Sequence, residues 1–203
     1  MYGWGGENFE LSFKTWLCGG RLDIIPCSHV AHLDRNSGDR PYANATGRAG
    51  VNFLRTAELW MDEYKRVVYL FHTKIKNDSI IGAMDEQLEL KKKLNCKPFS
   101  WYVKNIIPDK FIPDENSKMY GRLRSGRNMN ICADNFIRNG LTLNSVVENA
   151  FLGQYPCHPD LKYSQYVALT RSHELRDFYH CAEISKGIPF DKIKMVLCNG
   201  NFT

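Results

Sequence analysis

The stretch of sequence that decides the fold is WGGENFELSFKTWLCGG, residues 4–20. Its apolar residues recur at helical spacing, and a glycine pair follows them as a C-terminal stop. The residues on this face are Phe9, Phe13, Trp16 and Leu17. A second glycine pair precedes them, so the backbone can adopt positive φ and present Glu7 and Asn8 into a cleft. We predict a helix with Glu7 at its positive end. From the spacing alone, it is equally open that Gly-Gly-Glu-Asn is only a turn before a core helix.

Composition describes a globular protein. The chain has 203 residues, of which 43% are hydrophobic and 12% aromatic, enough for one sizeable core or two small ones. The formal charge is +5, and the one tight basic run, residues 91–93, lies at the end of a predicted helix. We therefore predict no nucleic-acid partner. No apolar run reaches the ~18 residues of a membrane span, so we predict no such span in this chain.

The cysteines point to a secretory environment. Seven cysteines accompany three N-glycosylation sequons, which begin at Asn44, Asn77 and Asn201. An odd count leaves one cysteine as a free thiol, in an intermolecular bond, or paired with a partner outside this chain. We favour the last, and expect the chain to be part of a longer glycoprotein with Met1 as an internal methionine.

The first half of the chain alternates polar loops with helical patterns. Residues 21–25 alternate in polarity and predict a short strand ended by a proline. Residues 36–50 form a loop that could act as a lid, although an ordinary connector is the favoured interpretation. Residues 51–71 keep a helical stripe that predicts one long core helix, and residues 84–94 predict a shorter one.

The second half of the chain has a different composition and pattern. Residues 108–117 are rich in Pro, Asp and Ser, as in a linker between domains, and beyond them short runs predict small strands. A weak repeat is visible as ICAD at 131–134 followed by Cys157, and HCAE at 180–183 followed by Cys198. We expect a mainly β domain in which each repeat holds one internal disulfide.

These motifs resemble a known family, the polypeptide N-acetylgalactosaminyltransferases. The family pattern Trp-Gly-Gly-Glu-Asn-x-Glu-x-Ser-Phe-Arg-x-Trp-x-Cys-Gly-Gly is met at residues 4–20, with Lys14 in place of the usual Arg. Three further blocks agree: PCSHV at 26–30 leading to a histidine, WMDEYK at 60–65 and LNCKPFSWY at 94–102. The resemblance implies a Golgi glycosyltransferase that moves GalNAc from UDP-GalNAc to Ser or Thr of a polypeptide acceptor. Transfer would be retaining, depend on Mn²⁺ and initiate mucin-type O-glycosylation.

The resemblance also implies an architecture. Residues 1–107 would be the C-terminal half of an α/β fold of the glycosyltransferase A type, and residues 108–117 a linker. Residues 118–203 would be a partial ricin-type lectin domain, a mainly β trefoil that binds a GalNAc-type glycan. Both domains would be incomplete: the catalytic part would lack its nucleotide-binding half, and no third lectin repeat precedes Thr203.

Roles in catalysis carry over position by position. Glu7 matches the carboxylate that holds the donor sugar's hydroxyls, and Trp4 an aromatic of a mobile loop near the nucleotide. Arg35 and Tyr42 match lid groups that reach the diphosphate, although this lid is two residues longer than usual. His32 matches the histidine that binds the catalytic Mn²⁺. The family's Asp-x-His motif is absent from this chain, so the metal site would be half present.

A zinc cluster is the alternative at Cys27-x-His29-x-x-His32, and we disfavour it because the spacing fits no common zinc pattern. In the lectin part the resemblance assigns a sugar-binding carboxylate to Asp134 and pocket-flanking groups to Tyr155 and His158. It implies three disulfides and leaves Cys27 over. The implied pairs are Cys18 with Cys96, Cys132 with Cys157, and Cys181 with Cys198.

Two functions follow from these patterns. The first is a piece of a GalNAc-transferase, whose 203 residues alone we expect to be inactive because the nucleotide-binding half is missing. The alternative is a catalytically inactive, lectin-like carbohydrate-binding protein, which the changes in the lid would favour.

Overall fold

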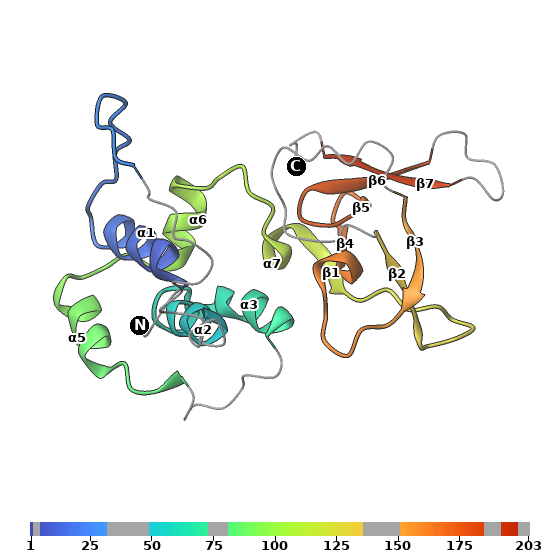
Figure 1. Cartoon of the computed structure of the whole chain (residues 1–203), viewed down its shortest axis with the longest axis horizontal. Helices are drawn as coiled ribbons and strands as arrows, with labels where there is room; N and C mark the ends of the chain where they lie inside the picture. Colours follow the sequence, from blue (N-terminus) through green and yellow to red (C-terminus); the bar gives the residue numbers. More distant parts are fainter. Residues whose placement is uncertain (2–4, 32–48, 73–80, 136–150, 185–191, 199–203) are drawn as a thin grey trace. The chain divides into compact units, whose positions relative to one another are not determined.

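The computed structural model describes residues 1, 5–31, 49–72, 81–135, 151–184 and 192–198. The chain divides into two compact units, Met1–Pro108 and Asp109–Thr203 (Figure 1). Described residues of the first unit form helices, and those of the second form mainly strands. The protein therefore mixes helix and sheet.

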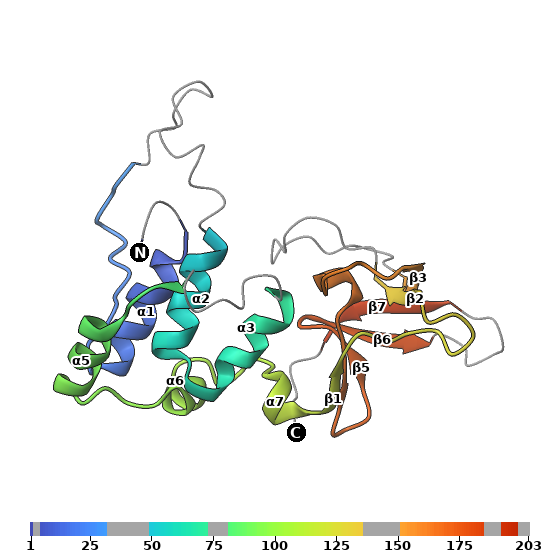
Figure 2. The same cartoon turned by 90° about the horizontal axis from the view of Figure 1, so that it is seen from below.

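The first unit is a group of helices around an aromatic core. Phe13 of α1 meets the rings of Phe99 and Tyr102 edge-on, at centroid distances of 5.0 and 5.1 Å. Leu54 and Trp60 are buried with them. The helices are α1 (Glu7–Leu17), α2 (Ala49–Trp60), α3 (Lys65–Phe71), α5 (Asp85–Lys93) and α6 (Phe99–Asn105). Figure 2 shows them from a second side.

The predicted helix after the first glycine pair is confirmed, and it ends as the second pair requires. Gly19 has φ 88°, and the Gly19 and Gly20 amides donate to the carbonyls of Trp16 and Thr15 at 3.3 and 2.8 Å. This is the Schellman arrangement, which satisfies carbonyls that a helix end leaves open. The shorter helix predicted at residues 84–94 is also confirmed, as α5.

Two predictions for this unit are wrong. Residues 21–25 form no strand: Ile24 is 95% exposed, and no strand of the described residues in this unit offers the hydrogen bonds a strand needs. The predicted single helix at 51–71 is broken after Trp60 by a 3-10 turn, Asp62–Tyr64, before α3 begins. Asp62 has φ 46°, a conformation outside a right-handed helix that Asp tolerates better than most residues.

The second unit contains two antiparallel sheets, in line with the mainly β prediction. One has the order β1-β4-β5-β6-β7 and the other pairs β2 with β3. Tyr166 and Phe178 stack at 4.5 Å in its core. Its strands are β1 (Ser117–Gly121), β2 (Ile131–Asp134), β3 (Gly153–Pro156), β4 (Val167–Thr170), β5 (Leu175–Arg176), β6 (His180–Ile184) and β7 (Ile193–Leu197). A short helix, α7 (Pro113–Asn116), precedes β1.

The sequence repeat is a structural repeat. Cys132 of β2 pairs with Tyr155 of β3, and the disulfide partner Cys157 lies two residues further on. Cys181 of β6 pairs with Val196 of β7, and its partner Cys198 again lies two residues further on. Each repeat thus contains an antiparallel strand pair with one internal disulfide, and the second pair is the edge of the five-stranded sheet.

Candidate functional site

Glu7 stands at the exposed start of α1 because of the glycines before it. Gly5 and Gly6 are buried, with φ of 100° and 88°. A Cβ built on Gly5 would lie 2.8 Å from the Cβ of Ala49, and one on Gly6 3.2 Å from the Cβ of Asn52. The turn therefore lies against the first turns of α2, where no side chain fits. Glu7 then emerges into solvent in the first turn of α1, where the helix dipole favours a carboxylate.

The other residues assigned to catalysis, Trp4, Arg35, Tyr42 and the metal ligand His32, lie outside the described residues. Within the part of the chain that is described, no three His, Cys, Asp or Glu side chains gather in a way that could hold a metal ion. Cys27 is exposed and unpaired, and the ring of His29 contacts the carbonyl of Pro26 at 3.1 Å. Of the residues assigned to catalysis and metal binding, Glu7 is thus the one within the described part of the chain.

The far end of α1 is held by a disulfide and a backbone bond. Cys18 is bonded to Cys96, 78 residues away in sequence. The Lys97 amide donates to the carbonyl of Leu17 at 2.8 Å. These two links join the end of α1 to the segment that leads into α6. The orientation of α1, and with it the position of Glu7, is therefore fixed from both ends.

Asp62 is a supporting residue that sequence reasoning missed. Its carboxylate accepts the Phe99 amide at 2.7 Å, and so caps the start of α6 from a distant turn. The same carboxylate pairs with Lys91 of α5 at 2.9 Å. Lys91 also donates to the carbonyl of Leu59 at 2.9 Å. The WMDEYK block marked the position, but the partners of Asp62 lie 29 and 37 residues away and carry no local signal.

A second supporting carboxylate lies on α2. Glu58 accepts Lys65 at 2.6 Å and the Tyr69 hydroxyl at 2.5 Å, and so ties α2 to α3 across the break. Burial raises the pKa of Glu58, but the hydrogen bonds from Lys65 and Tyr69 and the charge of Lys65 outweigh it, and the pKa is lowered.

The candidate sugar-binding residues of the second unit gather around one short turn, Tyr163–Gln165. Ser164 donates from its hydroxyl to Asp134 at 3.3 Å. Gln165 accepts the His158 amide at 2.9 Å and donates to the carbonyl of Pro156 at 3.0 Å. The rings of Tyr155 and His158 lie 5.5 Å apart. The turn thus contacts Asp134 at one end of the β2–β3 pair and His158 beyond the other end, where the Tyr155 ring lies against His158.

These three residues differ in exposure. Asp134 is 3% exposed, while the ring of Tyr155 at the ribbon surface is 37% exposed. Because directly paired residues share a face and the face repeats every second residue, Asp134, Cys132 and Tyr155 lie on one face. A carboxylate can accept hydrogen bonds from sugar hydroxyls, and an exposed aromatic ring can cover an apolar sugar face.

Comparison with known proteins decides the family. A protein named probable N-acetylgalactosaminyltransferase 9 of Caenorhabditis elegans is 38% identical over 97% of this chain and 33% of its own length. Polypeptide N-acetylgalactosaminyltransferase 6 of Mus musculus is 38% identical over 85% of this chain and 27% of its own. The chain belongs to the polypeptide N-acetylgalactosaminyltransferase family. No family model matches it.

The structural comparison agrees with membership of the GalNAc-transferase family. A crystal structure of GalNAc-T7 with UDP, GalNAc and Mn²⁺ matches with a TM-score of 0.58 and 27% identity, over 98% of this chain and 35% of that one. The chain therefore spans about a third of the length of the family members it matches. The three disulfides in the structure are the same pairs that the resemblance implies. Among the described helices of this family member, none is long and apolar enough to cross a membrane.

Proposed function

We propose that this chain is part of an enzyme that transfers GalNAc from UDP-GalNAc to Ser or Thr of polypeptides and so initiates mucin-type O-glycosylation in the Golgi. The relatives are transferases by name, and GalNAc-T7 was crystallised with UDP, GalNAc and Mn²⁺. Transfer would proceed with retention of configuration. Because the relatives are named as transferases, we do not propose a carbohydrate-binding protein without catalysis.

Within this structure, the main support for the proposal is the close packing of the Gly5-Gly6 turn against α2. This packing presents Glu7 at the start of α1. A carboxylate there can accept hydrogen bonds from two hydroxyls of a donor sugar. Trp4 would cover the nucleotide, and Arg35 and Tyr42 would stabilise the charge that develops on the departing diphosphate.

Manganese would serve the same leaving group. Mn²⁺ stabilises negative charge on phosphate oxygens, and His32 would be its ligand from this chain. The 203-residue chain on its own would not transfer GalNAc, because further ligands and the nucleotide-binding half would come from other sequence.

The two units would then have separate tasks. Residues 1–107 would belong to a catalytic domain of the glycosyltransferase A type, and residues 118–203 to a ricin-type β-trefoil. Asp134, Tyr155 and His158 would bind a GalNAc-type glycan, which would direct the enzyme to acceptors that already carry sugar.

A chimera tests this function. The chain would replace the matching third of the Caenorhabditis elegans relative, and the purified chimera would be given UDP-GalNAc, Mn²⁺ and a Thr-rich peptide. We expect a peptide product heavier by one GalNAc, and none when Mn²⁺ is replaced by EDTA. A folded chimera that binds UDP but never glycosylates the peptide would contradict the proposal.

A further inference from the structure

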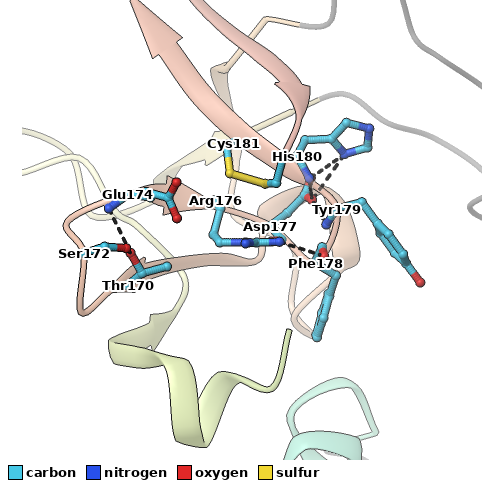
Figure 3. Close-up of a disulfide and its surroundings, with 10 residues drawn as sticks. Thr170, Ser172, Glu174, Arg176, Asp177, Phe178, Tyr179, His180 and Cys181 are labelled. Carbon is cyan, nitrogen blue, oxygen red and sulfur yellow. Dashed lines mark hydrogen bonds and ion pairs between the residues drawn. A yellow bond between two sulfur atoms is a disulfide. The ribbon is translucent and has the colours of Figure 1, made fainter. Parts of the chain in front are cut away.

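The second unit contains a buried polar cluster centred on Asp177 (Figure 3). Its carboxylate accepts the amides of Tyr179 and His180, each at 2.7 Å, and lies 3.1 Å from Nδ1 of His180. The second carboxylate oxygen also accepts the side-chain amide of Asn135 at 2.8 Å. Asn135, Asp177 and His180 are all at most 6% exposed. A carboxylate buried to this degree makes strong and directional hydrogen bonds.

The contact between Asn135 and Asp177 joins the two sequence repeats. Asn135 follows directly after β2, and Asp177 directly precedes the turn into β6. The backbone amide of Asn135 also donates to the carbonyl of Ser164 at 2.9 Å. Ser164 is the residue whose hydroxyl donates to Asp134. The end of β2 is therefore held at Asn135 by Asp177 and at Asp134 by Ser164.

Arg176 makes the Asp177 turn rigid. Its guanidinium donates to the carbonyls of Asp177 and Phe178 at 3.0 and 3.2 Å, and it lies 4.2 Å from the centre of the Phe111 ring. Arg176 is 2% exposed. Asp177 is thus a fixed point against which Asn135 can be held.

The second repeat serves as an internal control. Its residue equivalent to Asp134 is Glu183, and its residue equivalent to Asn135 is Ile184. Both are exposed, and Ile184 has no polar side chain with which to make such a contact. A ribbon of this kind therefore forms without the anchor. The anchor accompanies the repeat whose carboxylate, Asp134, is buried and shares a face of the strand pair with Tyr155.

We propose that Asp177 is a positioning residue for the carboxylate of Asp134 and acts through Asn135. The proposal rests on the proposed binding of a GalNAc-type glycan at Asp134. A sugar hydroxyl donates well only to a carboxylate oxygen held in place, and the Asn135 anchor prevents the end of β2 from shifting.

A reciprocal swap tests the inference. In Asp177→Asn, the new amide nitrogen faces the amide of Asn135; in Asn135→Asp, two carboxylates face each other. Each single variant removes the present hydrogen bond from the Asn135 amide to the Asp177 carboxylate. The double variant restores it with donor and acceptor exchanged. The probe is methyl α-GalNAc, titrated into the full 203-residue chain and followed by NMR, with circular dichroism to show that each variant is folded.

We expect each single variant to bind the sugar about tenfold more weakly, because one buried hydrogen bond is lost. The double variant should bind the sugar within about threefold of the unchanged chain. If the single variants unfold, a folded double variant with restored binding still supports the proposal, and a folded double variant without binding overturns it. Asp134→Asn separates the two claims. If it abolishes binding while Asp177→Asn does not weaken it, Asp177 has no positioning role and the sugar site stands. If the unchanged chain binds no sugar, both claims fail.

Discussion

Removing the carboxylate of Asp62 is expected to weaken the first unit strongly. In Asp62→Ala the Phe99 amide loses a charged acceptor and Lys91 loses its ion-pair partner. The hydrogen bond to a charged group is worth about 2 kcal/mol, and the partly exposed ion pair about 0.5 kcal/mol. Alanine at φ 46° costs about 1 kcal/mol more. We therefore expect a loss of 3 to 4 kcal/mol, a shift of about 1.5 M in the urea midpoint.

Tryptophan fluorescence is the assay for this change. The chain has four tryptophans, at positions 4, 16, 60 and 101, and all belong to the unit Met1–Pro108. Their signal therefore follows unfolding of this unit alone. Asp62→Asn keeps an acceptor and tolerates the positive φ, so it should lose only about 1 kcal/mol. Glu63→Ala, at an exposed position of the same turn, is the matched control and should change stability by less than about 0.5 kcal/mol. If Asp62→Ala shifts the midpoint no more than Glu63→Ala, Asp62 does not cap α6.

Three further predictions concern glycine packing and pH. Gly5→Ala should lower the free energy of unfolding by more than about 2 kcal/mol, because the new Cβ would collide with Ala49. Gly19→Ala, at φ 88° but with open space around it, should lower it by about 1 kcal/mol. Equal losses for the two variants would contradict the close packing of Gly5. The pKa of Glu58 is lowered in the folded protein, so its ionised carboxylate stabilises the fold at pH values above the unfolded pKa of about 4.3. This stability is lost as the pH falls through the pKa of the folded state. In Glu58→Gln, the stability followed by fluorescence should therefore fall less in acid than in the unchanged chain, by a difference of less than about 1 kcal/mol. Burial raises the pKa of the Tyr166 hydroxyl. The protonated hydroxyl therefore contributes its full share of folding stability below pH about 10, and this share is lost at higher pH. In Tyr166→Phe, the circular dichroism of the second unit should be less sensitive to alkali.

Local patterns predicted the elements whose causes are local. The stop after α1 follows from Gly19-Gly20, because glycine adopts the positive φ that the helix end uses. The two ribbons follow from the repeated cysteines, since each disulfide closes within its own repeat. The clustering of Asp134, Tyr155 and His158 came from resemblance, and the turn that gathers them was not foreseen.

Features with distant causes escaped prediction. The helical stripe of residues 51–71 continues through Asp62, but the chain breaks there and the side chain of Asp62 reaches Phe99 and Lys91. Alternation at residues 21–25 shows only that a strand would be compatible with these side chains; it says nothing about a neighbouring strand. The contact of Asn135 with Asp177 spans 42 residues and has no sequence pattern.

The most direct test of the proposed enzyme is the transfer rate of the chimera with and without the carboxylate of Glu7. Glu7 and Glu10 both lie in the first turn of α1, and Glu10 pairs with Lys14 at 3.1 Å. Glu7→Gln should lower the rate of GalNAc transfer to the peptide by about 10- to 100-fold, because charged hydrogen bonds to the donor sugar are lost. Glu10→Gln should keep the transfer rate within about threefold of that of the unchanged chimera. Equal rates for the two folded variants would contradict the account of Glu7 as the donor-sugar contact.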